Sequence, residues 1–161
     1  MNGKNIVLVP SDNPMWHEFY SGYVADPMMS DVPYVYDYEA CEAAYVRKMA
    51  DATRKYFSIV DSGKVVGEIY LKHIDWEAGS AEFGIAMIDD SVKGKGFGTE
   101  AIELLLKYAF GVLGLETMIA TAVLRNVRSQ HVLGKLGFVY THSDVKFKYY
   151  ELKRAWAGSA G

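Results

Sequence analysis

The hydrophobic and polar positions of the chain divide it into short segments of two periodicities. Apolar runs of strand length and alternating character occupy residues 4–9, 56–60, 65–74, 80–88, 116–123, 138–142 and 146–152. Apolar positions at helical spacing occupy residues 12–24, 39–52 and 126–136, and a further helix pattern follows the glycine-rich segment 93–99 and runs to about Val112. The element order is therefore predicted to be βααβββαβαββ.

Glycine and proline mark the ends of several of these elements. Pro10 ends the first strand, and Gly114 ends the third helix, whose residues Ile102, Leu105, Ala109 and Val112 we expect on one buried face. The sequence 61–64 is typical of a hairpin turn, so the three strands before the third helix should form an antiparallel meander. The next strand–helix–strand unit requires a right-handed parallel crossover. The prediction is an α/β (α+β) fold with a mixed, mostly antiparallel sheet of about seven strands flanked by about four helices.

Composition limits the classes of protein to which the chain can belong. Its 161 residues suit one domain, which we place at 1–154, followed by a flexible tail at 155–161. A formal net charge of −3 argues against a broad basic face for nucleic acid. No apolar run approaches the length of a membrane span and no signal-peptide pattern is present, so we expect a cytoplasmic protein.

Metal and thiol chemistry find little support in the residue spacing. Cys41 stands alone, which excludes an internal disulfide and a cysteine zinc site. The four histidines are scattered without a ligand pair, so no metal site is predicted. Twelve tyrosines suit a cleft that is apolar and still able to form hydrogen bonds, although half-buried sheet positions would account for them as well.

The segment Lys93-Gly94-Lys95-Gly96-Phe97-Gly98-Thr99 carries the chemistry that the sequence reveals. It follows a strand and begins a helix, where glycines let a ligand approach the main chain and consecutive N–H groups bind phosphate. The spacing fits neither the Rossmann fingerprint nor the P-loop. Two interpretations remain, a pyrophosphate cradle and a glycine-rich connection that serves only as a turn.

This segment resembles the cofactor signature of the GNAT superfamily of N-acetyltransferases: Gln or Arg, two residues, Gly, one residue, then Gly or Ala. Residues 93–98 match it with Lys93 in the first position. Downstream, residues 126–138 resemble the family's Asn-led helix that ends in Lys-x-Gly-Phe. The element order also agrees, so the resemblance covers nearly the whole chain. Within the superfamily it is most similar to the ribosomal-protein N-terminal acetyltransferases.

The resemblance implies direct attack of a primary amine on acetyl-CoA in a ternary complex. Cofactor contacts then fall on the main chain of Ile85, Ala86 and Met87, on the whole segment 93–99, and on Asn126 and Ser129. Glu82 becomes the leading base and His73 a second candidate, whereas a surface or strand-pair carboxylate is the alternative for Glu82. The tyrosine acid of many relatives is replaced by Leu133, which leaves Ser129 to stabilise the thiolate, with Asn126 as a further catalytic candidate. Asn126 also suits an N-cap and Ser129 a helix surface.

The acceptor is the part of the reaction that the sequence leaves open. The resemblance favours a protein N-terminal α-amine. The alternatives are a small-molecule amine (polyamine, aminoglycoside or amino acid) and a catalytically silent CoA-binding module. We expect no nucleic acid or membrane partner and a monomer or homodimer.

Overall fold

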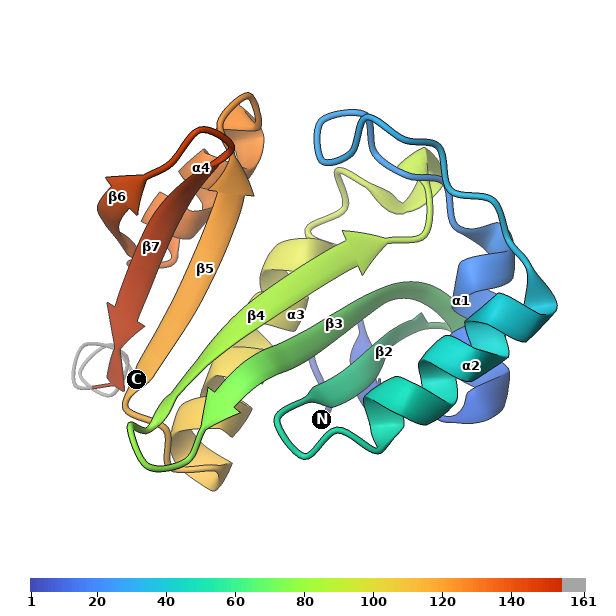
Figure 1. The fold of residues 1–161 in the computed structure, drawn as a ribbon, viewed down its shortest axis with the longest axis horizontal. Helices are drawn as coiled ribbons and strands as arrows, with labels where there is room; N and C mark the ends of the chain where they lie inside the picture. The colour runs from blue at the N-terminus through green and yellow to red at the C-terminus, as the bar shows by residue number, and fades with distance from the viewer. Residues whose placement is uncertain (155–161) are drawn as a thin grey trace.

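The computed structural model describes residues 1–154, and the predicted tail at 155–161 lies outside the described residues. Within residues 1–154, seven strands form one mixed sheet in the order β1-β2-β3-β4-β5-β7-β6 (Figure 1). The strands are Val7–Pro10 (β1), Lys55–Asp61 (β2), Lys64–Asp75 (β3), Ser80–Met87 (β4), Thr117–Val123 (β5), Val139–Ser143 (β6) and Phe147–Lys153 (β7). The helices are Asn13–Gly22 (α1), Tyr38–Met49 (α2), Phe97–Lys107 (α3) and Val127–Lys135 (α4), with short helices Asp90–Val92 (η1) and Tyr108–Val112 (η2). The predicted fold and element order are confirmed.

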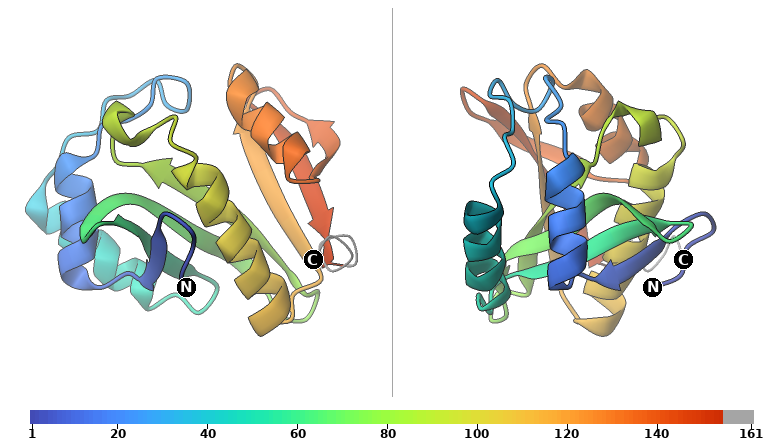
Figure 2. Two further views of the ribbon diagram at one scale, coloured as in Figure 1. Left: turned by 180° about the vertical axis from the view of Figure 1, so that it is seen from behind. Right: turned by 90° about the vertical axis from the view of Figure 1, so that its right-hand side faces the viewer.

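Alternation along the central strands directs their side chains to two different layers. Ile69 and Leu71 of β3 are fully buried with Ala101 and Leu105 of α3 in the main core. Intervening residues face α1 and α2, where Trp16, Cys41 and Tyr56 form a second buried cluster. Figure 2 shows α3 and α2 on opposite sides of the sheet. The sheet therefore separates the large main core from a smaller cluster centred on Trp16 and Tyr56.

The strands β4 and β5 are parallel, and they pair only at their beginnings. The register runs from Ser80 opposite Thr117 to Glu82 opposite Ile119. Beyond this point β4 pairs with β3 and β5 with β7, and the two strands diverge (Figure 1). The remaining edge of β4, from Phe83 to Met87, is thereby open toward β5.

Two local predictions differ from the structure. The first strand begins at Val7 rather than Lys4, because the N–H groups of Lys4, Asn5 and Ile6 donate to the carboxylate of Glu100 at 2.9–3.1 Å instead of pairing in the sheet. The buried position assigned to Val112 is also wrong, since this residue is 73% exposed.

The π-helical turn of η2 explains the exposure of Val112. The N–H of Leu113 donates to the carbonyl of Tyr108, five residues earlier. This wider turn shifts the helical periodicity, so that Leu113 packs against the core in place of Val112. Apolar spacing alone does not reveal such a turn.

Candidate acetyl-CoA site

Two glycines in the left-handed region shape the loop that enters α3. Gly94 has a φ of +76° and Gly96, the N-cap of α3, a φ of +80°. A side chain in this region is strained, which is why glycine occupies both positions. No side chain caps α3, so its first N–H groups remain directed at the space in front of the helix.

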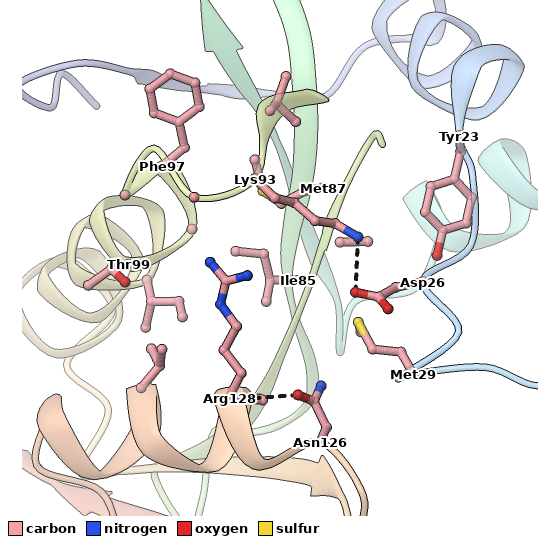
Figure 3. A pocket seen from close by; sticks show the side chains of 18 residues that line it. Tyr23, Asp26, Met29, Ile85, Met87, Lys93, Phe97, Thr99, Asn126 and Arg128 are labelled. Carbon is pink, nitrogen blue, oxygen red and sulfur yellow. Dashed lines mark hydrogen bonds and ion pairs between the residues drawn. The ribbon is translucent and has the colours of Figure 1, made fainter. Parts of the chain in front are cut away.

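That space is a cavity of about 220 Å³ (Figure 3). Its lining comes from five parts of the chain: the end of β4, the glycine loop, the start of α3, α4 and the segment after α1. The predicted cofactor residues that line it are Ile85, Ala86, Met87, Lys93, Gly94, Gly96, Phe97, Gly98, Thr99, Asn126 and Ser129. Lys95 instead places its ammonium 5.9 Å from the ring centre of Phe97.

The open edge of β4 supplies main-chain groups to this cavity. The N–H of Ile88 donates to Val66 of β3 at 2.8 Å, and antiparallel hydrogen bonding alternates along a strand. The main-chain groups of Ile85 and Met87 consequently point away from β3, toward the unpaired side, whereas those of Ala86 point toward β3. An amide-containing ligand arm can therefore pair with Ile85 and Met87 as an added strand does.

Lys93, the predicted phosphate cation, is paired with two carboxylates. Its ammonium lies 2.9 Å from Asp26 Oδ2 and 2.8 Å from Asp90 Oδ1. Partial burial lowers the pKa of Lys93, but these hydrogen bonds outweigh it and raise the pKa. For Asp26, burial raises the pKa, and the hydrogen bond from Lys93 helps to bring it below its ordinary value. Lys93 thus ties the segment after α1 to the glycine loop.

Arg128 is a cation of the cavity to which the sequence analysis assigned no role. Its side chain extends from α4 into the space between Thr99 and Ile85 (Figure 3). In the part of the chain that the structure describes, Arg128 takes part in no ion pair. The sequence feature that could have indicated this role is the position of Arg128, two residues after Asn126, in the first turn of a helix that faces the glycines.

Arg128→Met is expected to weaken acetyl-CoA binding about fivefold to tenfold, roughly 1–1.4 kcal/mol, through loss of a phosphate contact. The affinity of the variant should also depend less on salt than that of the wild type. Calorimetry at two ionic strengths measures both effects, with Arg47→Met on α2 as the control. An unchanged affinity in Arg128→Met would exclude this residue from the phosphate site.

The catalytic candidates of α4 lie at its first turn. Asn126 is the N-cap, and its Oδ1 accepts the N–H of Ser129 at 3.1 Å. Both residues line the cavity. Leu133, at the position of the tyrosine acid, is 3% exposed and belongs to the main core.

Glu82 lies at the last paired position of β4 and β5, on the sheet face opposite the main core. Its carboxylate is 3.7 Å from Lys72 Nζ and 3.2 Å from His73 Nδ1. Among the described residues, neither Glu82 nor His73 belongs to the lining of the cavity. The structure therefore brings the cofactor candidates together but places both predicted bases in an ion-pair group of their own.

A comparison with protein families shows to which family the chain belongs. The sequence pattern of the acetyltransferase (GNAT) domain matches residues 6–139. The chain belongs to the GNAT acetyltransferase family. The matched residues include the glycine loop and the open edge of β4.

Spermidine acetyltransferases are among the relatives of this GNAT domain. The spermidine N(1)-acetyltransferase of Vibrio cholerae is 28% identical over 103 residues, which are 63% of this chain and 59% of that protein. The match thus spans about three-fifths of the length of that relative. These relatives differ from the ribosomal-protein subgroup that the sequence motifs favoured.

Solved structures of a Vibrio cholerae spermidine N-acetyltransferase share the fold. Its complex with CoA and spermine has a TM-score of 0.83 at 21% identity, covering 94% of this chain and 96% of that one. A dodecameric structure of the enzyme has a TM-score of 0.80 at 19% identity, covering 95% and 96%. At these identities the likeness establishes the fold.

Two further observations bear on the expected partners. No helix in residues 1–154 is both long enough and apolar enough to cross a membrane. Across the same residues, the histidine, cysteine and acidic side chains do not gather into a group of three that would hold a metal ion.

Proposed function

We propose that this protein transfers the acetyl group of acetyl-CoA to a primary amine of a small cationic molecule, with polyamines as the first candidates. The observation that carries the proposal is the cavity in which the uncapped start of α3, Arg128 and the open edge of β4 converge. Phosphates are bound by helix N-termini and arginine, and a pantetheine arm by a strand edge. The residues present therefore fit acetyl-CoA.

The acceptor class rests on the relatives and on the residues beside the cavity. Spermidine acetyltransferases support the small-molecule alternative over the protein N-terminal α-amine that the motif resemblance favoured. Beyond Tyr23, a cavity residue, lie further tyrosines and a buried glutamate. Aromatic rings and carboxylates are the groups that bind alkylammonium ions.

In the proposed reaction the amine nitrogen attacks the thioester carbonyl carbon. The resulting oxyanion is stabilised by a main-chain N–H at the open edge of β4, for which Ile85 and Met87 are the candidates. The carbon–sulfur bond then breaks, the amide is released, and the thiolate is stabilised by the Ser129 hydroxyl. An amine proton ends on the sulfur.

Thermal unfolding with acetyl-CoA, free CoA and NAD, followed by thiol release with several amines, tests the proposal. Saturating acetyl-CoA should raise the unfolding midpoint by about 5–10 °C, and NAD should leave it unchanged. Spermidine should be acetylated with a kcat/KM at least about tenfold above that of a peptide with a free N-terminus.

Each contrary result has its own meaning. The absence of a shift with acetyl-CoA would overturn the cofactor assignment, and preference for the peptide would restore the protein N-terminal acceptor. Binding of acetyl-CoA without turnover on any amine would instead favour the silent CoA-binding module, which the exchange of the tyrosine acid for Leu133 makes a specific alternative. The predicted monomer or homodimer is checked by light scattering of the same samples.

A further inference from the structure

A glutamate of β3 lies beside the cofactor cavity, on the sheet face opposite the main core. Glu68 is directly opposite Ala86 in the register of β3 and β4, and Ala86 lines the cavity. Side chains at such a pair share one face of the sheet, with their Cβ atoms about 4.5–5.5 Å apart. Glu68 is only 5% exposed, which is unusual for a carboxylate.

The two oxygens of Glu68 are in different situations. Oε2 accepts a hydrogen bond of 2.9 Å from the Tyr20 hydroxyl. Oε1 accepts no hydrogen bond from the residues that the structure describes. In that part of the chain, every fully buried side-chain oxygen or nitrogen has a hydrogen-bond partner. Oε1 therefore retains accessible surface, and its lone pairs are available to a donor from outside the chain.

Tyrosines connect this carboxylate with the cofactor cavity. The ring centres of Tyr20, Tyr23 and Tyr34 are 5.4–6.2 Å apart, and Tyr23 lines the cavity next to Asp26 (Figure 3). On the sheet side, Tyr70 stacks with Tyr56 at 4.9 Å. This tyrosine group, defined as Tyr20, Tyr23, Tyr34 and Tyr70, offers several ring faces to an alkylammonium chain.

The carboxylate has no direct ion-pair partner in residues 1–154. The ammonium of Lys48 acts on Glu68 through space, but it lies over the rings of Trp16 and Tyr56, at 5.6 and 5.7 Å. Burial raises the pKa of Glu68 to about 7, although the Tyr20 hydrogen bond and Lys48 lower it. The titratable groups that surround Glu68 are Tyr20 of α1, Cys41 and Lys48 of α2, Tyr56 of β2, Tyr70 of β3, and Tyr23 and Tyr34 between α1 and α2. A buried carboxylate without a paired cation favours a cationic ligand.

From this geometry we propose that Glu68 receives the ammonium group of the acceptor and takes its proton, while the tyrosine group holds the adjoining alkyl chain. The inference rests on the proposed N-acetyltransferase function and deepens it. One proton passes from the ammonium to Glu68 Oε1 and on to solvent, which leaves the neutral amine. The nitrogen lone pair then forms the bond to the carbonyl carbon, the carbon–sulfur bond breaks, and the second proton ends on the CoA sulfur.

Glu68→Gln tests the proposal because it keeps the size of the side chain and an oxygen for the Tyr20 hydroxyl. We expect its kcat/KM for spermidine to fall about 100-fold, the scale of a lost general base, while its Kd for acetyl-CoA stays within about twofold of the wild type. The acid limb of the wild-type pH profile, near pH 7, should disappear. Glu103→Gln, on the exposed side of α3, is the matched control and should behave as the wild type.

Tyr20→Phe tests the role of Glu68 through the pH dependence of kcat/KM, which would not change if Glu68 were only structural. The Tyr20 hydrogen bond lowers the pKa of Glu68, so its removal should shift the acid limb of kcat/KM to higher pH. Calorimetry of spermidine binding to the CoA-loaded protein adds a measurement that needs no turnover. The wild type should bind spermidine, and Glu68→Gln should bind it at least about tenfold more weakly.

The outcomes separate this inference from the function on which it rests. Near-wild-type turnover and binding in Glu68→Gln, together with a large loss in Glu82→Gln, would overturn the role of Glu68 and leave the N-acetyltransferase function intact. Spermidine binding that depends on Glu68 without acetylation would refute the function and support the ammonium site. A wild type that neither binds nor acetylates spermidine would overturn both.

Discussion

Glu68→Gln is expected to gain stability relative to the wild type as the pH rises, by about 2.5 kcal/mol between pH 5 and pH 8. The folded state raises the pKa of Glu68 from 4.5 to about 7 through burial. A raised carboxyl pKa stabilises the fold fully below pH 4.5, and this contribution is lost as the pH rises through 7. Glutamine does not titrate, so only the wild type loses it.

The measurement is the unfolding midpoint of both proteins across this pH range. For a domain of this size, 2.5 kcal/mol corresponds to a relative shift of about 5–10 °C. Any constant packing cost of the glutamine amide cancels, because only the change with pH is compared. Glu103→Gln should follow the wild type at each pH. If the difference in midpoint between Glu68→Gln and the wild type stayed constant from pH 5 to pH 8, folding would not raise the pKa of Glu68.

Gly98→Ala is expected to weaken acetyl-CoA binding about 30-fold, or roughly 2 kcal/mol, without loss of stability. Gly98 lies in the first turn of α3 and lines the cavity, and an added methyl group would meet only Ile85 Cδ1, at an ordinary 3.8 Å. The fold therefore accepts alanine. The methyl group would nevertheless occupy the surface that a phosphate must approach to reach the helix N–H groups.

Gly111→Ala is the matched control for this variant. Gly111 also lies in a helical turn, an added Cβ would meet nothing within 4 Å, and the residue is not part of the cavity lining of residues 1–154. Alanine favours helix over glycine, so both variants should unfold at or slightly above the wild-type midpoint. Calorimetric titration with acetyl-CoA gives the affinities; an equal affinity for Gly98→Ala and Gly111→Ala would place the pyrophosphate elsewhere.

Local patterns in the sequence were sufficient for the element order and the position of the glycine loop. Strand alternation and helical spacing depend only on neighbouring residues, as do the positive φ angles that select glycine at positions 94 and 96. The helix at residues 97–112 shows the limit of this reasoning, since one π-helical turn exposes Val112 without changing the apolar spacing.

Charge was the property that local patterns predicted least well. Lys93 begins the glycine-rich segment, and in the structure it pairs with Asp26, 67 residues earlier, as well as with its sequence neighbour Asp90. Arg128 reaches the cavity from α4, a helix that contacts β5 on the far side of the open edge of β4. Ion pairing depends on which distant segments meet, and no spacing in the sequence records that.

The sequence by itself determined the family fold and the glycine loop, because propensity, periodicity and backbone conformation act over a few residues. Only the tertiary structure distinguished the two glutamates of the neighbouring strands. Glu82 pairs with Lys72 and His73, whereas Glu68 is buried beneath Tyr20, 48 residues away in the chain. Desolvation and charge compensation are properties of the folded environment, and they give the two carboxylates different surroundings.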